Sequence, residues 1–163
     1  IAQCLVGSEM CIRDRIGGVV MSKINKFRGD YAFLSNFYPC IIHYKEMTFR
    51  CSEAMFQSFK CRTREDAEMF QDFDGLTSKR MSHKIKVRDD WYNISISAMY
   101  ITLKEKFTQN PALKEKLLAT GDSYLEEGNT WNDKFWGVSY GVGENYLGKL
   151  LMLVRKELLE GKY

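Results

Sequence analysis

The chain has 163 residues, of which 45% are hydrophobic and 28% charged, with a formal net charge of +3. This length predicts one domain with a sizeable core, and two prolines without a low-complexity run argue against a linker or a disordered arm. The weak positive charge permits an anionic ligand but does not require one, and no apolar run approaches the ~20 residues of a membrane span. Five cysteines with no CxxC pair and no histidine cluster argue against a zinc site or a disulfide scaffold. We therefore expect a cytoplasmic protein without a membrane segment, a metal or a cofactor.

Residues 1–20 differ from the rest of the chain. They show neither helical nor strand periodicity, and charged residues interrupt each apolar run, so the segment is a poor signal peptide. Met21 begins a stretch that has the form of a natural start, and the string LVGSEMCIRDR resembles translated adapter sequence from sequencing assemblies. We expect 1–20 to be a non-native or disordered leader, with a genuine short N-terminal arm as the alternative, and 21–163 to form the functional domain.

The first predicted elements follow an aromatic segment. Residues 27–39 contain two turn signals, so we expect short extended pieces within a loop. Residues 41–44 and 47–50 are rich in β-branched and aromatic side chains, which predicts a hairpin. Ser52 is a good N-cap residue and predicts that a helix begins there.

The predicted helix over 52–61 carries polar residues on one face. Glu53, Gln57 and Lys60 stand at i, i+4 and i+7, so they share a side of the helix. The opposite face is apolar, with Met55, Phe56 and Phe59. An acid and an amine in one row could serve as proton donor and nucleophile. A solvated polar stripe is the alternative, and this helix alone favours it because surface helices usually carry such stripes.

Helical spacing of apolar residues, together with residues typical of helix starts and ends, predicts most of the remaining chain as helix. The expected helices cover 63–70, 77–86, a long stretch from Asp89, 111–121 and the C-terminal segment after Gly143, and 122–140 is expected as a loop. The fold class is therefore α+β, mainly helical, with a small antiparallel strand element near the N-terminal third.

Two expected loops, 27–39 and 122–140, interleave aromatic with charged and amide side chains. Flat rings beside polar groups suit a nucleotide, and stacking on a base contributes about 1–3 kcal/mol where measured. The alternative is that the rings only close a core, and for any single tryptophan that interpretation is favoured. The residues alone thus indicate a nucleotide-sized site without naming a reaction.

Several segments, taken in order, resemble the NADAR family, also called YbiA-like. The similar segments are FRGDYAFLSNFYP (27–39), SEAMFQSFK (52–60), VRDDW (87–91), the KF-x-QNPALKEKLLATGD run (106–122) and NDKFWG-x-x-x-G-x-GENYLGKLLMLVR (132–155). The resemblance covers nearly all of 27–155 and implies a largely helical α+β fold. It also implies an N-glycosidase, acting on ribosylamine intermediates of riboflavin synthesis or on ADP-ribosylated guanine.

The resemblance carries over particular residues. The positions that match catalytic residues are Glu53, Lys60, Trp91 and Asp133. The positions expected to bind substrate are Arg28, Asn36, Arg88, Trp136 and Asn145. Many members have a histidine after the acid and a tyrosine before the glutamine, where this chain has Ala54 and Phe56. The resemblance therefore does not fix the substrate preference.

Two mechanisms fit these residues. In one, a desolvated Lys60 attacks the ribose C1 and displaces the amine as a Schiff base, while Glu53 or Asp133 supplies and accepts protons. In the other, Lys60 contacts phosphate and the two acids act as an acid and base pair. The expected partner is a small ribose-phosphate or ADP-ribosyl substrate, with ADP-ribosylated nucleic acid as a further possibility. A non-catalytic ADP-ribose-binding module is the alternative function.

Overall fold

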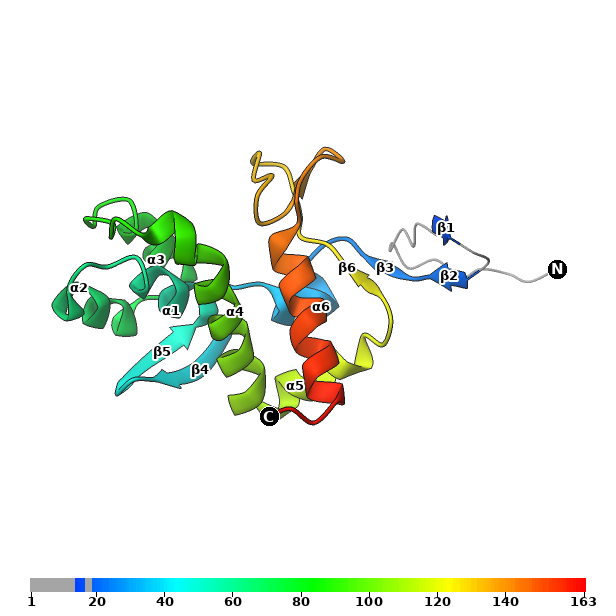
Figure 1. Ribbon diagram of the computed structural model, residues 1–163, viewed down its shortest axis with the longest axis horizontal. Coiled ribbons are helices and arrows are strands. Elements are labelled where there is room, and N and C mark those ends of the chain that lie inside the picture. Colours follow the sequence, from blue (N-terminus) through cyan, green and yellow to red (C-terminus); the bar gives the residue numbers. More distant parts are fainter. Residues whose placement is uncertain (1–13, 17–18) are drawn as a thin grey trace.

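The computed structural model describes the backbone of residues 14–16 and 19–163, and side chains from Ser22 onward (Figure 1). Most of the predicted leader lies outside the described residues. Its described part forms a short antiparallel pair, β1 (Asp14–Ile16) and β2 (Val19–Met21), although the sequence shows no strand periodicity there. No helix in the described part of the chain is long and apolar enough to cross a membrane.

The predicted hairpin is confirmed as β4 (Pro39–Tyr44) and β5 (Met47–Cys51), which pair antiparallel. Lys45 and Glu46 make the turn, both with positive φ, at 46° and 64°. Two successive left-handed residues give the primed turn that suits the twist of a hairpin, here without the usual glycine. The loop before the hairpin contains a 3₁₀ helix, η1 (Gly29–Leu34), where we expected short extended pieces.

Helix α1 (Ser52–Ser58) follows the hairpin directly, and all of its residues are buried. Cys51, not Ser52, is the N-cap, because its Sγ accepts a hydrogen bond from the backbone of Ala54. The helix packs against the hairpin, α3 (Gly75–Met81) and α4 (Trp91–Gln109). The interpretation of this helix face as a solvated polar stripe is therefore wrong.

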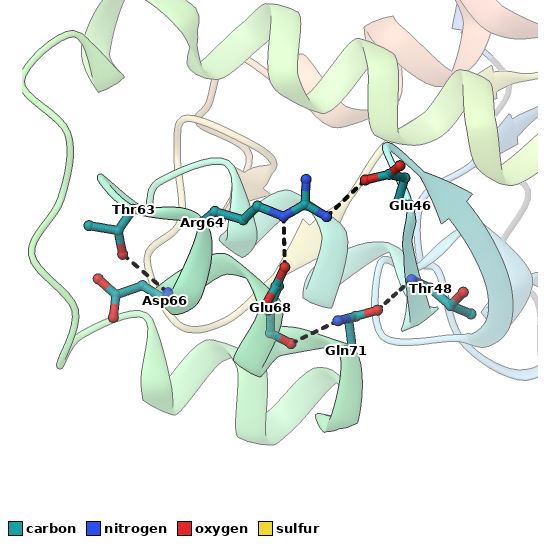
Figure 2. A network of polar contacts seen from close by, with 7 residues as sticks. All are labelled: Glu46, Thr48, Thr63, Arg64, Asp66, Glu68 and Gln71. Carbon is teal, nitrogen blue, oxygen red and sulfur yellow. Dashed lines mark hydrogen bonds and ion pairs between the residues drawn. The ribbon is translucent and has the colours of Figure 1, made fainter.

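A surface network fastens the next elements, α2 (Arg64–Glu68) and η2 (Met69–Asp72), to the hairpin (Figure 2). Arg64 donates to Glu68 at 2.7 Å and to Glu46 in the hairpin turn at 3.2 Å. The Gln71 side chain accepts from the backbone of Thr48 at 2.8 Å. Thr63 caps α2 as its capping-box pattern predicts.

Helices α4 and α6 (Tyr146–Leu159) lie side by side, while α3 lies beside α1 (Figure 1). Helix α3 begins two residues earlier than expected, because Asp74 caps its N-terminus by accepting a hydrogen bond from the backbone of Thr77. It ends at Met81, before the expected end at residue 86. Helix α4 packs against α5 (Pro111–Ala119) as well as against α6. Proline stands at the first turn of α5, as predicted.

The segment expected as a loop, 122–140, contains three two-residue strands. Strand β6 (Tyr124–Leu125) pairs parallel with β3 (Lys23–Ile24), and β7 (Gly128–Asn129) pairs parallel with β8 (Val138–Ser139). Two residues are too few to show the alternation by which a strand is predicted. These strands add parallel pairs to the expected antiparallel element. The mainly helical α+β class is confirmed.

Two clusters of buried side chains meet at α1. The larger joins η1, α4, α5 and α6 and includes Phe56, while the smaller joins the hairpin, α2 and η2 and includes Ala54 and Met55. Because α1 contributes to both clusters, its backbone is held on two sides. Its polar side chains are thereby fixed relative to the rest of the molecule.

Candidate functional site

A cavity of about 670 Å³ lies beside α1. Its walls come from α1 and the turn after it, α3, the first half of α4, the segment 35–37, the start of α6 and the segment between β6 and α6. Figure 1 shows that last segment at the end of the molecule where α4 and α6 begin. The volume lies within the range usual for small-molecule sites, and polar side chains converge on it from several elements.

Helix α1 contributes Glu53 and Gln57 to the cavity wall, and the turn that follows it contributes Lys60. The helix ends at Ser58, earlier than predicted. Glu53 is only 5% exposed, and one of its carboxylate oxygens accepts a hydrogen bond from Gln57 Nε2 at 2.7 Å. Burial raises the pKa of the Glu53 carboxyl, against the opposing influence of Gln57 and of the charges of Lys79 and Lys60. The acid is therefore desolvated and oriented, and it faces two amines.

Lys60 lies half-buried against two rings. Its Nζ is 5.4 Å from the ring centroid of Trp91 and 5.9 Å from that of Phe56. Burial lowers the pKa of the Lys60 ammonium, and the charge of Lys79 lowers it further. Such surroundings increase the fraction of neutral amine at a given pH, which is the form that attacks an electrophilic carbon.

Asp133 lines the cavity from the loop between β7 and β8. Its Oδ1 accepts hydrogen bonds from the backbone of Phe135 at 3.1 Å and of Trp136 at 2.9 Å. The Asn129 side chain accepts from the Asp133 backbone N–H and donates to its carbonyl, which fixes the turn. Trp136 in turn packs edge-on against Phe56, with ring centroids 5.3 Å apart. This wall is therefore locked to α1 through aromatic packing.

Six of the nine predicted residues line this cavity: Asn36, Glu53, Lys60, Trp91, Asp133 and Trp136. Asn36 is buried and its carbonyl accepts from the backbone of Glu53 at 2.9 Å, so it also holds the start of α1.

The other three lie outside the lining. Arg28 is exposed, with its guanidinium 6.0 Å from the ring of Trp131 at the cavity edge. Arg88 borders a separate hollow and pairs with Asp90 at 2.5 Å. Asn145 is buried behind the site, in the left-handed conformation with a φ of 54°.

The sequence did not indicate two charged residues of the cavity, Lys79 and Glu127. Lys79 stands in a basic run that is typical of a solvated face, and Glu127 stands beside a second glutamate in an expected loop. Exposed rings at the rim, on Phe37, Tyr92 and Trp131, were likewise not assigned to the site. The aromatic content of the two loops pointed toward Phe37 and Trp131, while Tyr92 lies outside both loops, on α4.

Known proteins share both sequence and fold with this chain. A family model described as the NADAR domain matches residues 24–159. The chain is 38% identical over 135 residues to a riboflavin biosynthesis protein of Vibrio vulnificus, covering 80% of this chain but 36% of that protein. It is 33% identical over 133 residues to N-glycosidase YbiA of Escherichia coli, covering 79% of this chain and 82% of YbiA.

The structural comparison agrees. The NMR structure of E. coli YbiA matches with a TM-score of 0.77 at 30% identity, covering 94% of this chain and 95% of that one. The chain thus spans about a third of the length of the Vibrio protein and most of the length of YbiA. On the family match over most of its length and on the shared fold, the chain belongs to the NADAR domain family.

Proposed function

We propose that this protein is an N-glycosidase that hydrolyses the bond between a ribose C1 and an amino nitrogen. The substrate is a phosphorylated ribosylamine of the riboflavin pathway or an ADP-ribosylated guanine. The observation that carries the proposal is that Glu53, Lys60 and Asp133 face one cavity beside the ring of Trp91. The names of the relatives, N-glycosidase and riboflavin biosynthesis protein, support the reaction class and the first substrate.

The preferred route uses Lys60 as a nucleophile. A ribosylamine carbon bears both the ring oxygen and the nitrogen, so it can form an imine with an amine. Burial and the neighbouring Lys79 favour the neutral amine of Lys60, and Glu53 stands near enough for its charge to act on Lys60. Water then releases the sugar from the Schiff base. In the second route Lys60 only binds phosphate, and Glu53 with Asp133 acts on an oxocarbenium-like carbon.

The cavity rim supports a substrate with a flat heterocycle. Trp131 is 58% exposed and Tyr92 88% exposed, although both line the cavity. Exposed rings at a cavity mouth offer stacking surfaces for a pyrimidine or a guanine. Phe56 also lines the cavity where many family members have tyrosine, while Ala54 lies in the core away from it. Of the two departures from the family pattern, only the one at Phe56 is therefore expected to affect substrate preference.

The direct test offers both substrate types to the purified protein and identifies the released base and sugar by mass spectrometry. We expect hydrolysis of at least one, and loss of turnover in Lys60→Ala and in Glu53→Gln with ligand affinity retained. Removing a nucleophile or a proton-transfer group commonly costs about 10²-fold or more in rate. Lys84→Ala is the matched control, because Lys84 is exposed and is not among the residues lining the cavity.

The outcomes separate the candidate functions. A wild-type protein that binds ADP-ribose by calorimetry but releases no base would support a binding module instead. A wild-type protein that neither binds nor cleaves any of these ligands would contradict both functions. Cytoplasmic location is part of the proposal, supported by the free thiols of Cys40, Cys51 and Cys61.

A further inference from the structure

Three carboxyl groups in the described part of the chain line the cavity, and Glu127 is the one to which the family motifs above assign no role. The surroundings of its side chain differ from those of the other two. Glu127 lines the cavity, yet its Oε2 is buried and has no hydrogen-bond partner among the described residues. Unpaired buried acceptors are rare in folded proteins, because leaving one unpaired costs about 1–3 kcal/mol. Such an atom beside a cavity is an available partner for a bound ligand.

The backbone of Glu127 is held on both sides. Its N–H donates to Asn145 Oδ1 at 3.1 Å, and its carbonyl accepts from the backbone of Val138 at 2.8 Å. A side chain at Gly137 would collide with the Glu127 carbonyl oxygen, so the glycine allows this close approach. Asn145, predicted to bind substrate, instead positions Glu127 in this structure. The position from which the Glu127 side chain enters the cavity is therefore set by the fold.

The charges around Glu127 favour its protonated form. Burial raises the pKa of the Glu127 carboxyl to about 7, the negative charge of Asp133 raises it too, and Arg28 opposes them. Burial raises the pKa of the Glu53 carboxyl as well, but a hydrogen bond from Gln57 and the charges of the two cavity lysines oppose this shift. Asp133 accepts hydrogen bonds from two backbone amides. Carboxyl groups in one site whose surroundings differ in this way commonly divide the acid and base functions between them.

We infer that Glu127 is a further catalytic residue, the acid that protonates the leaving nitrogen as the C1–N bond breaks. This assignment rests on the proposed function. It replaces the choice between Glu53 and Asp133 as the proton donor, and leaves those two to stabilise the positive charge that develops on the sugar.

The step balances in protons and electrons. Neutral Lys60 Nζ forms a bond to C1 while the electron pair of the C1–N bond passes to the nitrogen. The Glu127 proton goes to that nitrogen, and the amine departs neutral, leaving a Glu127 carboxylate. As the ring opens to the imine, the proton lost by Nζ goes to the ring oxygen.

Water then adds to C1 and gives a proton to the Glu127 carboxylate, which forms a carbinolamine. Glu127 passes this proton to Nζ, and the C1–Nζ bond breaks with its electron pair going to Nζ, while the C1 hydroxyl returns a proton to Glu127 and becomes the sugar carbonyl. The products are the free amine and the sugar, with both side chains restored.

The test compares Glu127→Gln with Glu126→Gln. Glu126 is the adjacent residue, pairs with Lys23 at 2.8 Å, and is not among the residues lining the cavity, so it is the matched control. On a ribosylamine phosphate, Glu127→Gln is expected to lower kcat by about 10²–10⁴-fold and to abolish the fall in rate above neutral pH. On an N-ribosyl pyridinium 5′-phosphate, whose pyridine leaves without a proton, the loss is expected to stay under about tenfold.

Two results would overturn this assignment: a Glu127→Gln protein that keeps the wild-type rate and the descending pH limb, or equal losses on both substrates. Carbon-13 NMR of the carboxyl groups, compared between wild type and Glu127→Gln, gives a readout independent of turnover. A Glu127 carboxyl that titrates near pH 7 supports the assignment, and one that titrates near pH 4 contradicts it. A wild-type protein inactive on every N-riboside would instead contradict the proposed function.

Discussion

Lys106 shows at the scale of one residue how a charge supports the site from the core. It is 0% exposed, and its Nζ donates to the carbonyl of Ser35 at 2.9 Å. Ser35 precedes Asn36 in the cavity wall, so the buried amine holds that wall from behind. Burial lowers the pKa of Lys106 to about 8, while the nearby Cys40 and Cys51 thiols oppose this shift. The hydrogen bond is thus retained at a cost in desolvation.

This cost predicts a dependence of stability on pH. Below about pH 8 both folded and unfolded states carry the Lys106 proton, so the cost is fully present. Between pH 8 and the ordinary value of 10.5 the unfolded state binds more protons, and stability rises with pH. We expect wild type to gain about 1 kcal/mol per pH unit relative to Lys106→Met in that window.

Urea unfolding of both proteins from pH 7 to 10 measures the difference. Cys51 and Cys61 act in the opposite direction, because burial raises the pKa of each to about 11 and stability is lost as these thiols ionise. Taking the difference between the two proteins removes most of that contribution. A difference that stays constant across the range would contradict a charged lysine in the core.

At the scale of elements, α6 and β6 approach closely at Gly148. A methyl group there would collide with the carbonyl of Leu125 and lie 2.6 Å from the side-chain nitrogen of Asn145. Asn145 donates to that same carbonyl at 2.9 Å and accepts from the backbone of Glu127. The packing of this helix on a two-residue strand therefore controls where the acid of the cavity lies.

Gly148→Ala is expected to lower the free energy of unfolding by about 1–3 kcal/mol through overpacking. Helix propensity alone would stabilise the same substitution by about 1 kcal/mol, so the two explanations predict opposite signs. Lys156→Ala on the exposed side of α6 is the control, because Lys156 pairs with Glu160 at 3.9 Å in an exposed contact that contributes little to stability. A stabilised Gly148→Ala protein would show that the contact with β6 is loose.

At the scale of the whole molecule, the N-terminal segment joins the site through β3. Ile24 is part of the larger core, and Lys23 pairs with Glu126 at 2.8 Å. The backbone carbonyls of Ser22 and Ile24 accept from Tyr124 and Glu126. The strand pair between β3 and β6 thus secures the chain immediately before Glu127. The strands β1 and β2, in contrast, project from the body of the molecule in Figure 1.

Two truncations are expected to differ. A chain that begins at Met21 should keep the thermal midpoint of the full chain, because β1 and β2 project from the body of the molecule (Figure 1). A chain that begins at Lys26 loses β3, and burial of Ile24 alone contributes about 2 kcal/mol, so it should unfold at lower temperature and lose activity. Calorimetry of the three chains measures this. Equal midpoints for the Met21 and Lys26 chains would contradict it, and so would a marked loss in the Met21 chain.

Sequence reasoning predicted those elements whose residue types strongly favour one local structure. The β-branched hairpin, the Thr63 cap and the proline at the start of α5 all lie where their residue types indicate. The cavity wall was predicted because Glu53, Gln57 and Lys60 are spaced for one helix face. Their burial was not predicted, since an amphipathic pattern assigns polar residues to solvent and cannot show that a second wall covers them.

The parts that sequence reasoning missed depend on contacts between distant segments. Glu127 reaches the cavity because Asn145 and Val138 hold its backbone, and neither contact leaves a periodic pattern. The parallel strand pairs are two residues long, too short for alternation to register. Arg88 had a motif match but pairs with Asp90 outside the cavity. A motif gives a residue's neighbours in sequence, while only packing decides which side chains meet.

In the proposed reaction, Lys60 attacks the sugar at C1. Reductive trapping with borohydride during turnover tests it directly, because reduction converts a lysine Schiff base into a stable secondary amine. We expect the protein to gain the mass of the reduced sugar phosphate in an adduct that maps to Lys60, is absent from Lys60→Arg and is present in Lys84→Ala. Full turnover without an adduct at Lys60, or an adduct confined to Lys79, would contradict it.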